Sequence, residues 1–287
     1  MRPAAPARCA DPAPAADAHD LRAGALQALE LETPQAKIAA VRRLAVSAGS
    51  LDRHRVLQPG GALPGRPPRP RLVPPRELPR RDAASAEGRA ALLHSIAHIE
   101  FNAINLALDA VWRFDGLPET FYRQWLGVAV EEALHFELLT QHLATLGHAY
   151  GDFDAHDGLW SMAEKTAGDL VARLALVPRA LEARGLDASP AIRARLAAAG
   201  DEAAARILDV ILRDEIGHVA IGNRWYRWAC ARDGLDPLTA DRQIADRYGA
   251  PPLRPPFNLQ ARLAAGFEAE ELSALAAAAT RTPRGRA

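Results

Sequence analysis

The chain has 287 residues, of which 49% are apolar, and its 35 Lys and Arg residues balance its 35 Asp and Glu residues. This length and composition allow a sizeable core in one or two domains, and zero net charge gives no overall attraction to nucleic acids or membrane surfaces. Two cysteines, Cys9 and Cys230, are too few to indicate a disulfide scaffold or a cysteine-based zinc site.

The first 19 residues are mainly Ala, Pro and Asp without periodicity, so we predict a disordered leader over residues 1–19. They lack the apolar centre of a signal peptide. No stretch of the chain approaches the roughly 20 apolar residues that a membrane span needs. We therefore expect a cytoplasmic protein without a membrane partner.

Residues 20–58 are expected to form N-terminal helices. Apolar side chains recur there every three or four residues, as at Leu21, Ala25 and Leu29. Pro34 interrupts the pattern, and we expect it to separate two short helices.

Residues 59–85 are predicted to form an extended arm. Seven prolines lie between Pro64 and Pro79, and six arginines lie between Arg66 and Arg81. Proline excludes a regular helix or a central strand, so the arm either lies along a folded body or acts as a linker. The arginines would also suit an anionic partner such as RNA, although a solvated or surface-packed arm is favoured.

Residues 86–235 are expected to form an all-α four-helix bundle, because no run in this region alternates with period two. The predicted helices span about 87–114, 119–147, 159–184 and 201–232. Pro118 opens the second helix and Gly147 closes it. Gly185 is expected to close the third helix, and Asp201 to cap the fourth.

The C-terminal region, residues 236–287, is predicted to pack on the bundle as a loop and a helix. A proline-rich loop over 248–256 is expected to lead to an amphipathic helical segment over about 258–279.

Two Glu-x-x-His pairs are the strongest chemical signal in the sequence. Glu132 and His135 lie on the apolar stripe of the second predicted helix, and Glu215 and His218 lie on that of the fourth. Residues three apart on a helix are neighbours, so each pair can converge on one ion. A buried carboxylate is costly unless a partner compensates it, and a metal ion does so.

One glutamate from each remaining helix would complete a two-metal site. Glu100 lies on the apolar stripe of the first helix, 32 residues before Glu132. Glu182 lies near the end of the third helix, 33 residues before Glu215. These matching intervals favour Glu182 over Glu164, the other candidate. The competing interpretation is a buried Glu–His hydrogen-bond network without metal.

Other polar residues suggest supporting roles. Glu131 and Asp214 each precede a histidine by four residues and could hold a histidine ring on a neighbouring helix; solvated surface charges are the alternative. For His94 and His98 we favour helix packing or support of the ligands. Asp157 is expected to cap the third helix.

Several runs also carry a family resemblance: 98–100, 131–136, 150–160, 178–187, 213–219 and 257–267, together with the Pro/Arg arm at 64–81. On these runs the chain resembles the DUF455 family of ferritin-like proteins. The resemblance implies a ferritin-like bundle and assigns six metal ligands: Glu100, Glu132, His135, Glu182, Glu215 and His218. More distantly, the chain is similar to the tRNA 2-methylthio-isopentenyl-adenosine hydroxylase family of di-iron monooxygenases.

Four carboxylates and two imidazoles suit iron, with manganese as an alternative. We therefore expect an O₂-dependent oxidoreductase with two Fe ions, an external electron donor and an electron-transfer partner. Its expected reaction is hydroxylation of a small molecule or a modified nucleoside. A ferroxidase or iron-handling protein and a tRNA-modifying hydroxylase are the alternatives, and the two Glu-x-x-His pairs argue against a metal-free scaffold.

Overall fold

The computed structural model describes residues 20–47, 49–79 and 83–281, and the described part of the chain is helical without any β-strand. The predicted all-α fold is therefore confirmed. The predicted leader at 1–19 lies outside the described residues, as do residues 80–82 of the predicted arm. No helix in the described ranges is both long enough and apolar enough to cross a membrane.

Two short helices form an N-terminal layer, as expected: α1 (Leu21–Glu30) and α2 (Pro34–Val46). Asp20 caps α1, and Pro34 occupies the first turn of α2, where its missing N–H costs nothing. α1 packs on α3, and α2 packs on α4. The buried Lys37 joins this layer to the arm and the bundle, because its Nζ donates to Leu29 O, Gly65 O and Asn105 Oδ1.

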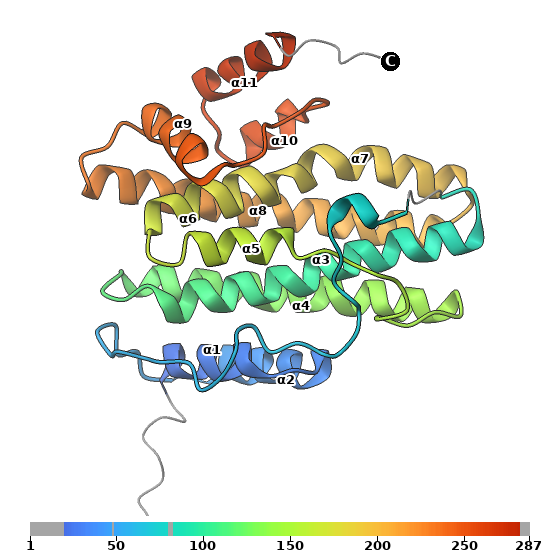
Figure 1. Cartoon of the computed structure of the whole chain (residues 1–287), viewed down its shortest axis with the longest axis horizontal. Coiled ribbons are helices and arrows are strands. Elements are labelled where there is room, and N and C mark those ends of the chain that lie inside the picture. The colour runs from blue at the N-terminus through green and yellow to red at the C-terminus, as the bar shows by residue number, and fades with distance from the viewer. Residues whose placement is uncertain (1–19, 48, 80–82, 282–287) are drawn as a thin grey trace, which may run out of the picture.

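The arm is extended over its described residues, apart from one 3₁₀ turn, η2 (Pro75–Glu77). It lies along the folded body and is not a free linker. Val73 N donates to Ala155 O over 2.8 Å, and Ala155 N donates to Arg71 O over 3.0 Å. Arg66 forms an ion pair with Asp157 at 2.7 Å. Figure 1 shows the arm passing from the α1–α2 layer to the start of α3.

Three long helices match their predicted positions closely: α3 (Ala86–Arg113), α4 (Glu119–Thr145) and α8 (Glu202–Arg232). α4 packs against both α3 and α8. Gly147 ends the second helix at a φ of +80°, a conformation that side chains with a Cβ rarely adopt. The side chain of Asp201 accepts from Ala204 N and caps α8, as predicted.

The prediction of one continuous third helix over residues 159–184 is wrong. The chain instead forms α5 (Gly158–Lys165), α6 (Leu170–Leu176), the π segment (Val177–Glu182) and α7 (Ala183–Ala198). A new helix starts at α6 because Asp169 accepts from Ala172 N. Gly185 does not end the helix, since α7 continues through it.

The π segment follows from the position of Pro178. Proline has no N–H and its ring clashes with the preceding turn, so the α-helical hydrogen-bond ladder cannot pass through it unchanged. The wider π turn takes up the interruption, and regular helix resumes at Ala183. Glu182 is thus the last residue of an irregular turn, whereas the other predicted ligands lie on regular helices.

The C-terminal region contains a helix that the sequence pattern did not predict, α9 (Pro237–Tyr248), capped by Asp236. The predicted segment 258–279 is divided into α10 (Leu259–Ala264) and α11 (Ala269–Arg281) by Gly266, whose φ is +83°. α9 contacts α6 and α8, and α10 contacts α7 and α8. Figure 1 shows these helices lying over α6, α7 and α8, on the side away from α1 and α2.

A candidate metal centre between α3, α4 and α8

Five of the six predicted ligands are buried in the middle of the bundle: Glu100, Glu132, His135, Glu215 and His218. α3 supplies one of them, and α4 and α8 each supply a Glu-x-x-His pair. None is more than 8% exposed. Three carboxylates held so close together inside a protein need compensating positive charge.

The side chains meet at one point. Single ligand atoms of Glu100, Glu132, His135 and Glu215 all lie within 4.8 Å of one another. Nδ1 of His135 is 3.1 Å from a carboxylate oxygen of Glu100 and 3.4 Å from one of Glu132. The structure therefore brings these four predicted ligands together, in a cluster that could hold a metal ion.

His218 adjoins the same cluster. Its Nδ1 lies 2.9 Å from Oε1 of Glu132 and 3.9 Å from Oε1 of Glu215. The rings of His135 and His218 are 5.9 Å apart between centroids. Glu132 therefore lies between the two histidines.

Carboxylate oxygens are left for a metal. Among the described residues, Oε2 of Glu132 makes a long contact of 3.4 Å with Nδ1 of His135, and Oε2 of Glu215 is buried without a hydrogen-bond partner. Buried polar atoms are rarely left in this state. Carboxylate oxygens and imidazole nitrogens are the ligands that iron and manganese prefer, so these residues fit such ions.

The charges of the cluster are strongly coupled. Burial and the neighbouring carboxylate of Glu132 raise the pKa of Glu100. Burial and Glu132 likewise raise the pKa of Glu215. Burial opposes ionisation of Glu132 itself, but the charges and hydrogen bonds of His218 and His135 lower its pKa below the usual range.

The pKa values of the two histidines of the cluster are both raised. Burial disfavours their charged forms, but the surrounding carboxylates outweigh it. Hydrogen bonds to Glu100 and Glu132 raise the pKa of His135 to about 11. The charge of Glu132 and a hydrogen bond to Glu131 raise the pKa of His218 well above its ordinary value. The cluster of carboxylates thus favours positive charge on the groups beside it.

An acid from the opposite helix holds each histidine. Nε2 of His135, on α4, lies 3.1 Å from Oδ2 of Asp214, on α8. Nε2 of His218, on α8, lies 2.6 Å from Oε2 of Glu131, on α4. This confirms the predicted supporting role of the two acids. In both histidines Nδ1 faces the cluster and Nε2 faces the acid, which fixes the orientation of the ring.

Glu182, the sixth predicted ligand, is not among the four residues whose ligand atoms lie within 4.8 Å of one another. It is partly buried, at the end of the π segment. Burial and the charges of Glu215 and Glu132 raise its pKa to about 8, so it lies within electrostatic reach of the centre. The rival Glu164 is exposed on α5, where it accepts a hydrogen bond from Trp160 Nε1.

A small cavity of about 10 Å³ lies beside Glu182. Its lining is mostly aromatic or aliphatic: Leu106, Ala110, Phe114, Phe121, Trp125, Leu174, Val177 and Pro178, with Arg173 and Glu182 as the charged members. This volume is about that of one water-sized probe, so the cavity has room for no more than one very small molecule.

The remaining predicted polar residues bind the loop between α4 and α5. Burial and nearby His94 lower the pKa of His98 to about 3, and the neutral ring lies 2.8 Å from the hydroxyl of Tyr150. His94 accepts from Gly151 N. Both histidines therefore have a packing role. The predicted capping role of Asp157 is not borne out by its side chain. Asp157 stands at the N-cap position of α5, but its carboxylate accepts from Arg66 and makes no capping hydrogen bond.

Buried arginines were missed by the sequence interpretation. Arg173 binds Asp109 of α3, and Arg179 binds residues of α8, α9 and α11. Arg173 precedes the π segment, and Arg179 lies within it. The signal available in the sequence was an arginine inside an apolar run, which requires a buried partner.

Comparison with known proteins gives a family for the chain but no activity. The model of the family described as "Protein of unknown function (DUF455)" matches residues 30–273. A protein of Haemophilus influenzae described as uncharacterized is 51% identical over 213 residues, which cover 72% of this chain and 74% of that protein. No solved structure matches the chain. Because the matched region includes every helix of the centre and most of the arm, we conclude that this chain belongs to the DUF455 family.

Proposed function

We propose that the chain is a ferritin-like protein that binds two metal ions, iron or a mixture with manganese, and uses O₂ to oxidise an organic substrate. The observation that carries the proposal is the convergence of Glu132, His135 and Glu215 on Glu100, with His218 against Glu132 and an acid of the facing helix behind each histidine. A hydrogen-bond network without metal would not leave a buried carboxylate oxygen of Glu215 unpaired.

The chain's own residues would divide the work. Glu132 and Nδ1 of each histidine would help to hold the ions. Asp214 and Glu131 would keep the rings in place and the proton on Nε2. When bound, the metal ions supply the reduction of O₂ and the oxidation of the substrate.

Glu182 would complete the set of ligands from the π segment. Its raised pKa means that it binds a proton more readily than an exposed glutamate does. It would therefore exchange a proton for a metal ion on binding.

Metal loading tests the site. Metal-free protein is incubated anaerobically with Fe(II) or Mn(II), and bound metal is measured after gel filtration. We expect about two ions per chain and a large loss in Glu132→Gln. Glu137→Gln serves as the control. Glu137 lies on the same helix as Glu132, α4, and pairs with Arg42 of α2. No bound metal in the wild type would refute the proposal.

A second measurement tests the reaction. O₂ uptake is followed in the iron-loaded protein with a reductant, and small molecules and modified nucleosides are compared in cells with and without the gene. A hydroxylated product that disappears with the gene supports the oxygenase. Oxidation of Fe(II) alone, with no organic product, would favour the iron-handling alternative. The electron donor and the cytoplasmic location are part of the same proposal.

A further inference from the structure

The π segment, which carries Glu182, is locally weak. Pro178 supplies no N–H to the helix, and π turns persist only where surrounding structure holds them. The ends of the segment must therefore be fixed by tertiary contacts. One contact precedes it: Arg173 of α6 binds Asp109 of α3 and Thr166.

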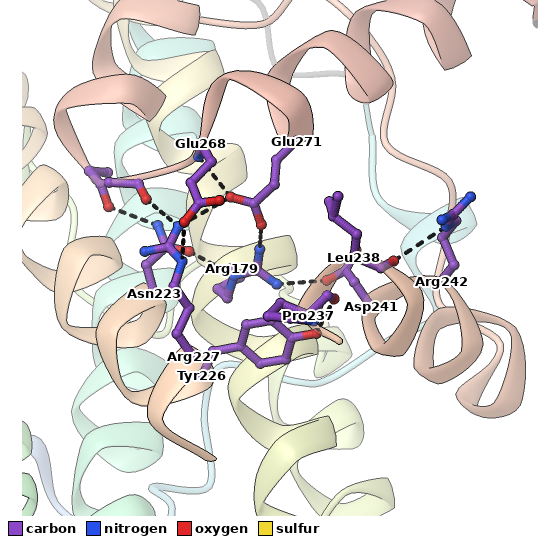
Figure 2. Close-up of polar contacts among 12 residues, drawn as sticks. Arg179, Asn223, Tyr226, Arg227, Pro237, Leu238, Asp241, Arg242, Glu268 and Glu271 are labelled. Atoms are coloured by element: carbon purple, nitrogen blue, oxygen red, sulfur yellow. Dashed lines mark hydrogen bonds and ion pairs between the residues drawn. The ribbon is translucent and has the colours of Figure 1, made fainter. Parts of the chain in front are cut away.

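The second contact is the guanidinium of Arg179, which Figure 2 shows between three elements. Its Nε donates to Asn223 Oδ1 of α8 over 2.7 Å, and its Nη1 donates to Asp241 Oδ1 of α9 over 2.7 Å. Its Nη2 donates to Glu271 Oε1 of α11. A residue of the π segment thus reaches α8 and both outer helices of the C-terminal region.

The guanidinium is also enclosed by aromatic rings. It lies 4.0 Å from the ring centroid of Tyr226 and 5.3 Å from that of Phe267. The side chain of Arg179 is only 4% exposed. Planar stacking and three separate donors match the geometry of arginine, and lysine could not reproduce them.

The partners of Arg179 are themselves held in place. Nδ2 of Asn223 donates to Ala265 O over 2.7 Å, which joins α8 to the turn after α10. Glu271 accepts from Arg227 of α8 over 3.2 Å and from the backbone N of Glu268 over 2.8 Å. The C-terminal helices and α8 therefore form a firm support around the guanidinium.

This support lies on the helix that carries Glu215 and His218. Asn223 follows Glu215 on α8 by eight residues, about two turns, so the contact of Arg179 is fixed relative to the metal ligands. Gly222 allows the π segment to approach α8 closely, because a Cβ there would lie 2.5 Å from Cβ of Pro178.

We infer that Arg179 is a positioning residue that holds the π segment against α8, α9 and α11 and thereby keeps Glu182 within reach of the metal centre. The inference rests on the proposed two-metal function. It gives the C-terminal helices α9 and α11 a role: they supply Asp241 and Glu271, which bind the residue that supports the sixth ligand.

The test compares three variants of the full chain. Arg179→Gln removes the three donors, and Glu271→Gln removes one carboxylate partner from a folded protein if the first variant is unstable. Arg262→Gln is the matched control. Arg262 is a buried arginine that joins the C-terminal region to α7 through Asp187, at 2.7 Å, and through Ala183 O, at 3.4 Å, so its side-chain hydrogen bonds lie on α7 and not on residues 177–182.

Two properties are measured in each variant: the affinities for the first and the second metal ion, and hydrogen–deuterium exchange of residues 177–182 in metal-free protein. We expect the second ion to bind about 10- to 100-fold more weakly in Arg179→Gln, with faster exchange in the segment. Glu271→Gln should show a smaller change in the same direction. Arg262→Gln should retain wild-type metal affinities.

The outcomes separate this inference from the proposed function. Wild-type affinity for both ions in Arg179→Gln and Glu271→Gln, with a metal-binding wild type, would overturn the inference alone. Equal losses in Arg179→Gln and Arg262→Gln would mean that docking of the C-terminal region in general supports the site, and would also overturn it. A wild type that binds no metal would overturn the proposed function and the inference with it.

Discussion

At the scale of the residue, the two supporting acids are as informative as the ligands. Their place four residues before each histidine was visible in the sequence, but the partner of each acid was not. An acid at this spacing could have held the histidine of its own helix. The structure shows the crossed arrangement, in which Asp214 of α8 holds His135 of α4 and Glu131 holds His218.

Removing either acid should weaken metal binding without unfolding the protein. We expect Asp214→Asn to lower the affinity by about 10- to 100-fold, because the ring of His135 loses the negatively charged acceptor that orients it and an uncharged amide oxygen holds it less firmly. Glu131→Gln should have a smaller effect, since that side chain is 53% exposed and water can replace it. Competition with a chelator measures both.

Asp209→Asn, at a surface residue of α8 that pairs with Arg193, is the matched control for these variants. Wild-type affinity in Asp214→Asn would show that the contact has no part in binding metal. Equal losses in Asp214→Asn and Asp209→Asn would point to a general effect of surface charge on α8.

At the scale of the element, the sequence pattern predicts α3, α4 and α8 correctly but not the elements between α4 and α8. α3, α4 and α8 follow from uninterrupted apolar stripes. The break at Asp169 has a local signal, because Gly168 and an N-cap aspartate follow the polar residues Glu164 to Thr166. The π segment does not follow from the pattern, because apolar residues continue through it and the periodicity hides the change of element. Pro178 was the available warning, and its effect depends on the tertiary contacts of Arg173 and Arg179.

Gly222 and Gly217, both on α8, provide a test of the close approach to the π segment. Gly222→Ala should destabilise the protein by about 1–3 kcal/mol, because the new Cβ would meet Pro178 at 2.5 Å. Gly217→Ala, which meets nothing within 4 Å, should stabilise it by about 0.5–1 kcal/mol through helix propensity. Urea unfolding of the metal-free proteins measures both.

This prediction requires Gly222→Ala to be less stable than Gly217→Ala. If Gly222→Ala is as stable as Gly217→Ala, the π segment can move away from α8 at no cost, and the close packing at Pro178 does not constrain it. Weaker metal binding in Gly222→Ala alone would agree with a role of that packing in the placement of Glu182.

At the scale of the whole molecule, the centre should link metal binding to stability. Three buried carboxylates from α3, α4 and α8 repel one another without cations, and under the proposed function metal ions would bind the assembled cluster but not the unfolded chain. One site stabilises the fold by about 2.7 kcal/mol at a metal concentration 100-fold above the dissociation constant. Thermal unfolding with Mn(II) and with a chelator should therefore differ by several degrees.

Glu132→Gln should remove most of this thermal shift, and Glu137→Gln should keep it. Equal shifts in the two variants would mean that Mn(II) stabilises the protein through another site. Anaerobic measurements with Fe(II) give the same comparison for iron.

The sequence predicted the all-α architecture because hydrophobic periodicity is local information. It predicted the ligand cluster because Glu-x-x-His combines a local spacing with a buried position. It did not predict the π segment that carries Glu182 or the existence of α9. Both depend on contacts between segments far apart in the chain, such as Arg179 with Asp241.

Lys37 has a consequence for chemical labelling. It is one of two lysines in the chain, and its amine is fully buried between α1, the arm and α3. Lys165, at the end of α5, is exposed. Of the two lysine side chains, an acylating reagent can therefore reach only Lys165 in the folded protein, and acylation of Lys37 reports that the N-terminal layer has separated from the bundle.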